Sequence, residues 1–323
     1  MLICIVFVVL TVIIITGIEI EDVLYVNWGQ HHYRYFVCRF LDYCVVGKHE
    51  GSLSGLSILE ITGKKPDFPG VVVANGDRYI PWIMNDGIHV YSLDGTLLER
   101  YSINDGETII SSCVSNLNDD GTDEILLITG KKGEEYGENL IVLSFDGEFK
   151  EVFRKTFVSM NPWKVQTCDV DGDGRREISI GVYKKAEFHP IMARRPFIYD
   201  WHGDSIAPKW RGSRLSRPFD DYIFVDIDSD GMDEIVSIEL LADGRKVINS
   251  YKWKGFGFEG IGESRAFEDV LMIKRGCSNG EASIVYAKVK RERSFEWVAM
   301  HYDDGKLVVK KRLKKYTPRI VVN

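Results

Sequence analysis

The sequence predicts an all-β protein, folded as a β-propeller of four-stranded antiparallel blades, five to seven in number with six as the best single count. Two observations predict this fold. Short runs rich in Val, Ile, Tyr, Phe and Trp are separated by Gly, Asp and Asn, which is typical of strands and turns. One acidic loop followed by an apolar strand recurs three times, at spacings of 53 and 57 residues, which matches one blade per repeat.

The chain opens with an uncharged apolar run, MLICIVFVVLTVIIITGI. Its length is at the lower limit for a membrane-spanning helix, and it lacks the basic start and the small-residue cleavage site of a secretory signal. We expect residues 1–20 to form an apolar helix that acts as a membrane anchor or an atypical signal. The alternative is a buried strand or a start site assigned too early. An anchor or signal predicts an extracytoplasmic protein, membrane-bound through this segment or secreted.

Residues 21–323 are expected to form one domain, because no Pro-rich or Ser-rich linker divides them. Besides the three repeats, two outer units have the same strands but lack the full acidic loop, at residues 62–70 and 275–281. The remaining flanks, residues 22–51 and the terminal PRIVVN, are expected to share one further blade. A blade that combines both chain ends would close the ring.

The three repeats align without gaps as NLNDDGTDEILLI, DVDGDGRREISIG and DIDSDGMDEIVSI. Each reads [DN]-x-[DN]-x-D-G-x-x-E. In an extended loop the side chains at positions 1, 3 and 5 turn toward a common centre, and glycine at position 6 permits a sharp turn. A carbonyl at position 7 and a carboxylate at position 9 complete a shell of oxygen ligands. Such a shell, without His or Cys, favours Ca²⁺ over transition metals.

The pattern therefore predicts two full Ca²⁺ sites with four carboxylates each, and a third, weaker site with two. An acid at position 9 followed by a strand distinguishes these loops from an EF-hand, which closes with Glu at position 12 between helices. The alternative is a turn rich in Asp, Asn and Gly that forms without metal. The predicted ligands, with carbonyls from Arg175, Met232 and Thr122, are Asp169, Asp171, Asp173, Arg175 and Glu177; Asp226, Asp228, Asp230, Met232 and Glu234; and Asn116, Asn118, Asp120, Thr122 and Glu124.

The pattern D-x-D-x-D-G-x-x-E before a strand resembles the FG-GAP (VCBS-type) repeats of the integrin alpha-subunit propeller and its bacterial relatives. The resemblance covers three units well and two loosely. It implies a propeller with calcium in hairpin loops at one rim, where the ion stiffens the blade. A clear Phe-Gly…Gly-Ala-Pro motif is missing. Because propellers of this kind mostly bind partners while some relatives are hydrolases or lyases, the resemblance leaves the function open.

A basic segment follows the second repeat and reads ARRPF…PKWRGSRLSRPF. Arginines beside an aromatic residue suit an anionic or carbohydrate ligand. The alternative is an inter-blade loop packed by arginine stems and paired with nearby acids. The candidate ligand surface consists of Arg194, Arg195, Trp210, Arg211, Arg214 and Arg217.

Composition and motifs narrow the function classes. The formal net charge of −7 argues against a nucleic-acid partner. Neither G-x-S-x-G nor H-E-x-x-H occurs, so we expect a non-enzymatic binding or scaffold module for a protein or carbohydrate. The alternative is a hydrolase or lyase acting on a polysaccharide or another anionic substrate at the central face. The six cysteines form no metal or disulfide pattern; Cys38 and Cys44 either pair or, like the others, are buried thiols.

Overall fold

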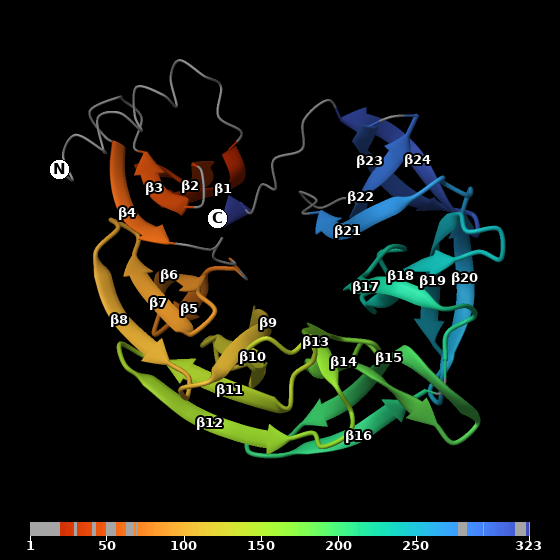
Figure 1. The fold of residues 1–323 in the computed structure, drawn as a ribbon, viewed down its shortest axis with the longest axis horizontal. Helices are drawn as coiled ribbons and strands as arrows, with labels where there is room; N and C mark the ends of the chain where they lie inside the picture. The colour runs from red at the N-terminus through yellow and green to blue at the C-terminus, as the bar shows by residue number, and fades with distance from the viewer. Residues whose placement is uncertain are drawn as a thin grey trace. The chain divides into compact units, whose positions relative to one another are not determined.

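The computed structural model describes residues 20–28, 31–40, 43–49, 56–62, 68, 70–212, 214–276, 283–292, 294–313 and 321–322. These residues form strands β1 to β25 and no helix, so the expectation of an all-β protein is confirmed (Figure 1). The chain divides into two compact units. The first is residues 1–105, 146–149 and 317–323, and the second is residues 106–145 and 150–316.

In the first unit, a five-stranded sheet has the order β25-β1-β2-β3-β4 and a four-stranded sheet the order β5-β6-β7-β8. The C-terminal strand β25 pairs in parallel with β1, so the two chain ends share a sheet as expected. The strands are β1 (Ile20–Trp28), β2 (His31–Phe40), β3 (Tyr43–His49), β4 (Leu56–Thr62), β5 (Val72–Ala74), β6 (Asp77–Ile83), β7 (Gly87–Ser92), β8 (Leu97–Ser102) and β25 (Val321–Val322).

The second unit is built from four antiparallel meanders of four strands each. Successive meanders contact one another through their first strands, β9, β13, β17 and β21. The strands are β9 (Glu107–Ser115), β10 (Glu124–Lys131), β11 (Asn139–Phe145), β12 (Phe149–Thr156), β13 (Pro162–Cys168), β14 (Glu177–Ala186), β15 (His189–Trp201), β16 (Ile206–Arg211), β17 (Phe219–Val225), β18 (Glu234–Leu240), β19 (Lys246–Trp253), β20 (Phe258–Ser264), β21 (Val270–Gly276), β22 (Ile284–Arg291), β23 (Ser294–Asp303) and β24 (Lys306–Leu313).

The last two meanders join into one eight-stranded sheet, because edge strand β20 pairs in parallel with edge strand β24 at Glu263–Lys306 and Ser264–Leu307. An edge strand presents free backbone N–H and C=O groups, and another edge satisfies them. A propeller consists of separate four-stranded blades, whereas these sheets contain five, four, four, eight and four strands. The predicted β-propeller of five to seven blades, with six as the best count, is therefore wrong.

The strands that follow the acidic loops lie inside their sheets, each second from an edge, and are buried on both faces over most of their length. In β10 every residue except the last is buried, and β18 has the same pattern. This burial explains their nearly continuous apolar sequences, EILLITG and EIVSIEL, because a strand covered on both faces has no need of polar residues on one side. Each such Ile or Leu contributes about 1.5–3 kcal/mol through burial.

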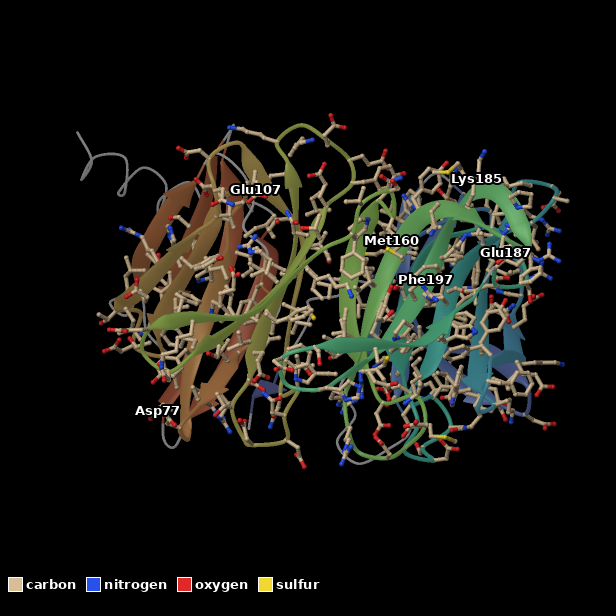
Figure 2. The ribbon with its side chains drawn as sticks, turned by 90° about the horizontal axis from the view of Figure 1, so that it is seen from below. Asp77, Glu107, Met160, Lys185, Glu187 and Phe197 are labelled. Carbon is tan, nitrogen blue, oxygen red and sulfur yellow. The ribbon has the colours of Figure 1, made fainter. Side chains whose placement is uncertain are left out.

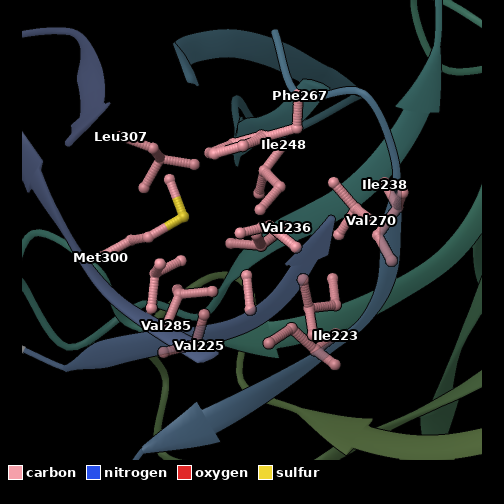
Figure 3. Close-up of a cluster of buried hydrophobic side chains, with 14 of the residues drawn as sticks. Ile223, Val225, Val236, Ile238, Ile248, Phe267, Val270, Val285, Met300 and Leu307 are labelled. Atoms are coloured by element: carbon pink, nitrogen blue, oxygen red, sulfur yellow. The ribbon is translucent and has the colours of Figure 1, made fainter. Parts of the chain in front are cut away.

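The largest buried cluster lies between the two halves of the eight-stranded sheet. Ile223 and Val236 from one half pack with Val270, Val285 and Met300 from the other (Figure 3). Two similar clusters hold the β9–β12 sheet against the β13–β16 sheet and the latter against β17–β20. This packing fixes the positions of the loops that connect the first and second strand of the first three meanders, and those loops are the acidic ones.

Three expectations concern residues outside the described part of the chain. These are residues 1–19 of the apolar helix expected over residues 1–20, most of the two decayed loops, and the side chain of Cys38; Ile20 itself lies in β1. Among the residues that are described, no helix is long and apolar enough to cross a bilayer. Cys113 and Cys168 are free thiols; Cys168 is buried, in line with the interpretation of the cysteines as small buried residues, and Cys113 is half-buried.

Candidate metal centre in three acidic loops

Three acidic loops occupy equivalent places in the second unit, each between the first and second strand of a meander. Loop 1 is residues 116–124, loop 2 is 169–177 and loop 3 is 226–234. Positions 4 and 6 have a positive φ in every loop: 55° and 81° in loop 1, 74° and 83° in loop 2, and 63° and 89° in loop 3. Glycine at position 6 is the residue that adopts this conformation without strain.

The three loops also share one pattern of hydrogen bonds between backbone and side chain. In each loop, one carboxylate oxygen of the glutamate at position 9 accepts a hydrogen bond from the backbone N–H at position 2. The distance is 2.9 Å for Glu124, 3.0 Å for Glu177 and 2.9 Å for Glu234. The acid at position 5 accepts the N–H of position 7 at 2.8–3.1 Å, in Asp120, Asp173 and Asp230. These bonds leave the second oxygen of each acid available to another partner.

In loop 3 the remaining oxygens converge on one point, and a lysine ammonium lies there. The Lys252 Nζ atom is 2.7 Å from Asp228 Oδ2, 2.6 Å from Asp230 Oδ2 and 3.0 Å from Glu234 Oε1. Burial raises the pKa of Glu234 to about 7, and its hydrogen bonds oppose this shift. Although burial lowers the pKa of Lys252, the three carboxylates outweigh it and raise that pKa above its ordinary value.

In loop 2 a different lysine takes this role. The Lys209 Nζ atom is 2.5 Å from Asp171 Oδ2, 2.5 Å from Glu177 Oε1 and 3.1 Å from Asp200 Oδ1. Burial raises the pKa of Glu177, opposed by the bond from Lys209. Despite its own burial, Lys209 has a raised pKa because of Asp171, Glu177 and Asp200.

In loop 1 an amide takes the corresponding place. Asn118 Nδ2 donates to Glu124 Oε1 at 2.6 Å, and Asn118 Oδ1 accepts from Trp201 Nε1 at 2.8 Å. Burial raises the pKa of Glu124 to about 7, with the N–H of Leu117 opposing it. The Oδ1 atom of Asn116, the predicted ligand at position 1, is buried and accepts no hydrogen bond.

The predicted metal ligands are therefore brought together in part. Carboxylate oxygens of Asp169, Asp171 and Asp173 lie within 4.8 Å of one another, as do those of Asp226, Asp228 and Asp230. Both oxygens of Asp169 accept backbone N–H groups, at 2.8 and 2.9 Å, and both oxygens of Asp226 do so at 3.1 Å. Thr122, Arg175 and Met232 were predicted to bind the metal through their carbonyls. In the structure their backbone N–H groups donate to the acid at position 5 of the same loop.

Sequence reasoning missed the charged residues of neighbouring strands that lie against loops 2 and 3. Lys252 follows Tyr251, the register partner of Ile235, and Asp200 follows Tyr199, the register partner of Ile178. Aligning YDW (residues 199–201) with YKW (residues 251–253) in the third strands of their meanders would have placed both Asp200 and Lys252 beside a loop glutamate. Lys209 gives no such signal, because a register shift between β15 and β16 directs its side chain.

The residues predicted to form an arginine-rich ligand surface each have different contact partners. The Arg194 guanidinium lies 4.7 Å from the Trp163 ring centroid, and Arg195 is fully buried. Arg217 pairs with the buried Glu239 at 3.2 Å and with Glu263 at 2.6 Å. Pairing with acids, as in the alternative interpretation, holds for Arg217 and, at 3.9 Å from Glu135, for Arg194, whereas Arg195 bonds backbone carbonyls within β14 and β15.

The rest of that segment is also divided. The Trp210 ring packs on Phe258, with centroids 4.9 Å apart, whereas Arg211 and Arg214 are exposed. Comparison with known proteins adds no assignment: the chain matches no protein-family model and no curated protein.

Proposed function

We propose that the chain is a non-enzymatic binding or scaffold module, outside the cytoplasm, whose acidic loops are stabilised by Ca²⁺. The observation that carries the proposal is the convergence in loop 3. Three carboxylate oxygens, from Asp228, Asp230 and Glu234, lie within 3.0 Å of one cationic nitrogen. Acids arranged in this way are favourable only around a positive charge, because like charges repel strongly in a partly buried site.

The residues of loop 1 fit a cation in a different way. The Asn116 Oδ1 atom is a buried acceptor without a donor, which ordinarily destabilises a folded protein. Asn116, Asp120, Glu124 and the Thr122 carbonyl would hold Ca²⁺ there, and the ion would supply the missing partner for Asn116. Few carboxylates and partial exposure suit weak Ca²⁺ sites, which function at extracellular calcium concentrations.

Loops 2 and 3 would take Ca²⁺ only in competition with Lys209 and Lys252. The same oxygens cannot surround both an ammonium and a divalent ion, so the lysine side chain has to leave. On this proposal the lysines keep the loops folded at low calcium, and loop 1 binds first although it has the fewest carboxylates. This order reverses the one expected from carboxylate count alone.

The test is a calcium titration of the metal-free full-length protein by calorimetry, with thermal melting in parallel. We expect Ca²⁺ to raise the melting temperature and a chelator to lower it, because a ligand that binds only the folded state stabilises that state. Asn116→Ala with Glu124→Gln should remove the first binding event. A matched control is Asp243→Asn, which changes an exposed Asp-Gly turn outside the three loops. A melting curve unchanged by Ca²⁺ and chelator would refute the proposal.

A further inference from the structure

Strands β14 and β15 extend beyond their other partners. Strand β13 pairs with β14 only as far as Val182, and β16 pairs with β15 only from Phe197 onward. Between these points residues 183–194 form a two-stranded ribbon, which we call the arm, whose strands pair only with each other. Figure 2 shows Lys185 and Glu187 at its outer end.

The base of the arm is braced by aromatic and cationic contacts. The Tyr136 ring stacks on Tyr183 with centroids 5.1 Å apart and planes 5° from parallel. On the opposing strand, the Arg194 guanidinium covers Trp163 and lies 3.9 Å from a carboxylate oxygen of Glu135. These contacts restrain the direction in which the arm leaves the sheet.

A buried arginine stiffens the arm from within. Arg195 is fully buried and donates to the carbonyls of Lys184 at 2.9 Å, His189 at 3.0 Å and Ile191 at 2.8 Å. The last two carbonyls belong to the outer part of β15, so the guanidinium ties the tip to the base. A ribbon held in this way loses little conformational entropy when it binds.

The tip of the arm is apolar and exposed. Phe188 is 88% exposed, Ile191 61% and Met192 38%, although exposed side chains of this kind are ordinarily scattered singly. The exposed Lys185 lies near them on β14, with Glu187 as the acid at the turn, whereas the Lys184 ammonium lies 5.9 Å from the Phe197 ring centroid, toward the base of the arm. The tip is thus apolar, and the arm as a whole carries three cationic side chains, Lys184, Lys185 and Arg194, against one acid.

We infer that the arm inserts its apolar tip into the headgroup region of an anionic lipid bilayer. Three such side chains expose on the order of 400 Å² in total, well below the ~800 Å² per partner that a stable protein interface buries. A bilayer accepts a convex tip without a complementary pocket. The net positive charge of the arm complements anionic headgroups electrostatically.

This inference is independent of the acidic loops. Strand β14 begins at Glu177 in loop 2 and ends at Ala186 in the arm, so its ten residues separate the two features by about 30 Å. Binding of the arm to a bilayer would leave loop 2 at the opposite end of β14. Calcium-independent membrane binding is therefore expected even if the loops hold no metal.

The test is hydrogen–deuterium exchange of the full chain with phosphatidylcholine vesicles and with vesicles that also contain phosphatidylglycerol. We expect amides of residues 184–192 to exchange several-fold more slowly with the anionic vesicles. Phe188→Ser with Ile191→Ser should abolish this protection, and Lys184→Gln with Lys185→Gln should remove its dependence on lipid charge. Because the readout is local to the arm, attachment through another segment does not produce it.

The matched control is Phe256→Ser, since Phe256 is 89% exposed in the turn between β19 and β20, at the end where loop 3 lies. It should leave the protection of residues 184–192 unchanged. Unchanged melting temperatures will show that the variants fold. Equal exchange with and without vesicles, or slowing that survives the Phe188 and Ile191 substitutions, would overturn the inference. Slowing that requires only a higher protein concentration would assign the tip to a second copy and would also overturn it.

Discussion

The Asp233 carboxylate accepts a hydrogen bond from the backbone N–H of Asp169 at 3.0 Å, and the N–H of Asp233 donates to the Asp169 carbonyl at 2.6 Å. Asp169 opens loop 2, and Asp233 lies at position 8 of loop 3. The same carboxylate also forms ion pairs with two arginines: Arg176 Nη1 lies 2.9 Å from Asp233 Oδ2, and Arg275 Nη1 lies 3.4 Å from Asp233 Oδ1. Two of the three acidic loops are therefore joined through one buried side chain.

Asp233→Ala should destabilise the protein by about 2–4 kcal/mol, because it removes the partner of a buried N–H and of two guanidinium groups. Urea denaturation measures this change. Asp243→Ala is the control, since Asp243 is exposed and pairs with the exposed Arg245, so the substitution should leave stability nearly unchanged. Equal effects of the two substitutions would show that the link between the loops has no energetic weight.

Lys252→Met should raise the calcium affinity of loop 3 about tenfold, because the competing ammonium is gone while the three carboxylates remain. Without calcium the same variant should melt at a lower temperature than the wild type, since the carboxylates then repel one another. Calorimetric titration and thermal melting measure the two effects. Lys254→Met removes the same charge from the neighbouring exposed turn and should do neither. Unaltered calcium binding in Lys252→Met would argue against competition.

The thiols of Cys113 and Cys168 should resist alkylation in the folded protein. Burial raises the pKa of Cys113 to about 12 and that of Cys168 well above its ordinary value, so almost no thiolate is present at about pH 8. We expect iodoacetamide to modify them only at the rate of unfolding, and to do so fully in urea. Peptide mass spectrometry resolves the two sites. Rapid labelling in buffer would mean that these strands open locally.

Arg195→Lys should destabilise the protein by about 1–3 kcal/mol, because a single ammonium cannot satisfy the three carbonyls that the guanidinium bonds. Amide exchange in residues 184–192 should accelerate at the same time, since the arm loses its internal tie. Arg211→Lys, at an exposed position on β16, is the control and should leave both quantities unchanged. Exchange that stays slow in Arg195→Lys would show that the aromatic contacts alone hold the arm.

The three acidic loops were predictable because their information is local. Gly121, Gly174 and Gly231 mark the left-handed position, and the glutamate three residues later bonds back to the start of the same loop. The lysines were not predictable from the loops. Lys252 and Lys209 arrive from strands that lie 18 and 32 residues away from the glutamates they contact.

The sequence by itself determined the all-β class and the three acidic turns, because each follows from residue pattern over fewer than about fifteen positions. Only the tertiary structure decided how the sheets combine. Strand β24 pairs with β20 rather than ending a separate blade, and that choice depends on which edges meet once the cores have packed. The same packing placed the Lys252 ammonium among the acids of loop 3. The number of carboxylates in a loop therefore does not by itself determine which cation the loop holds.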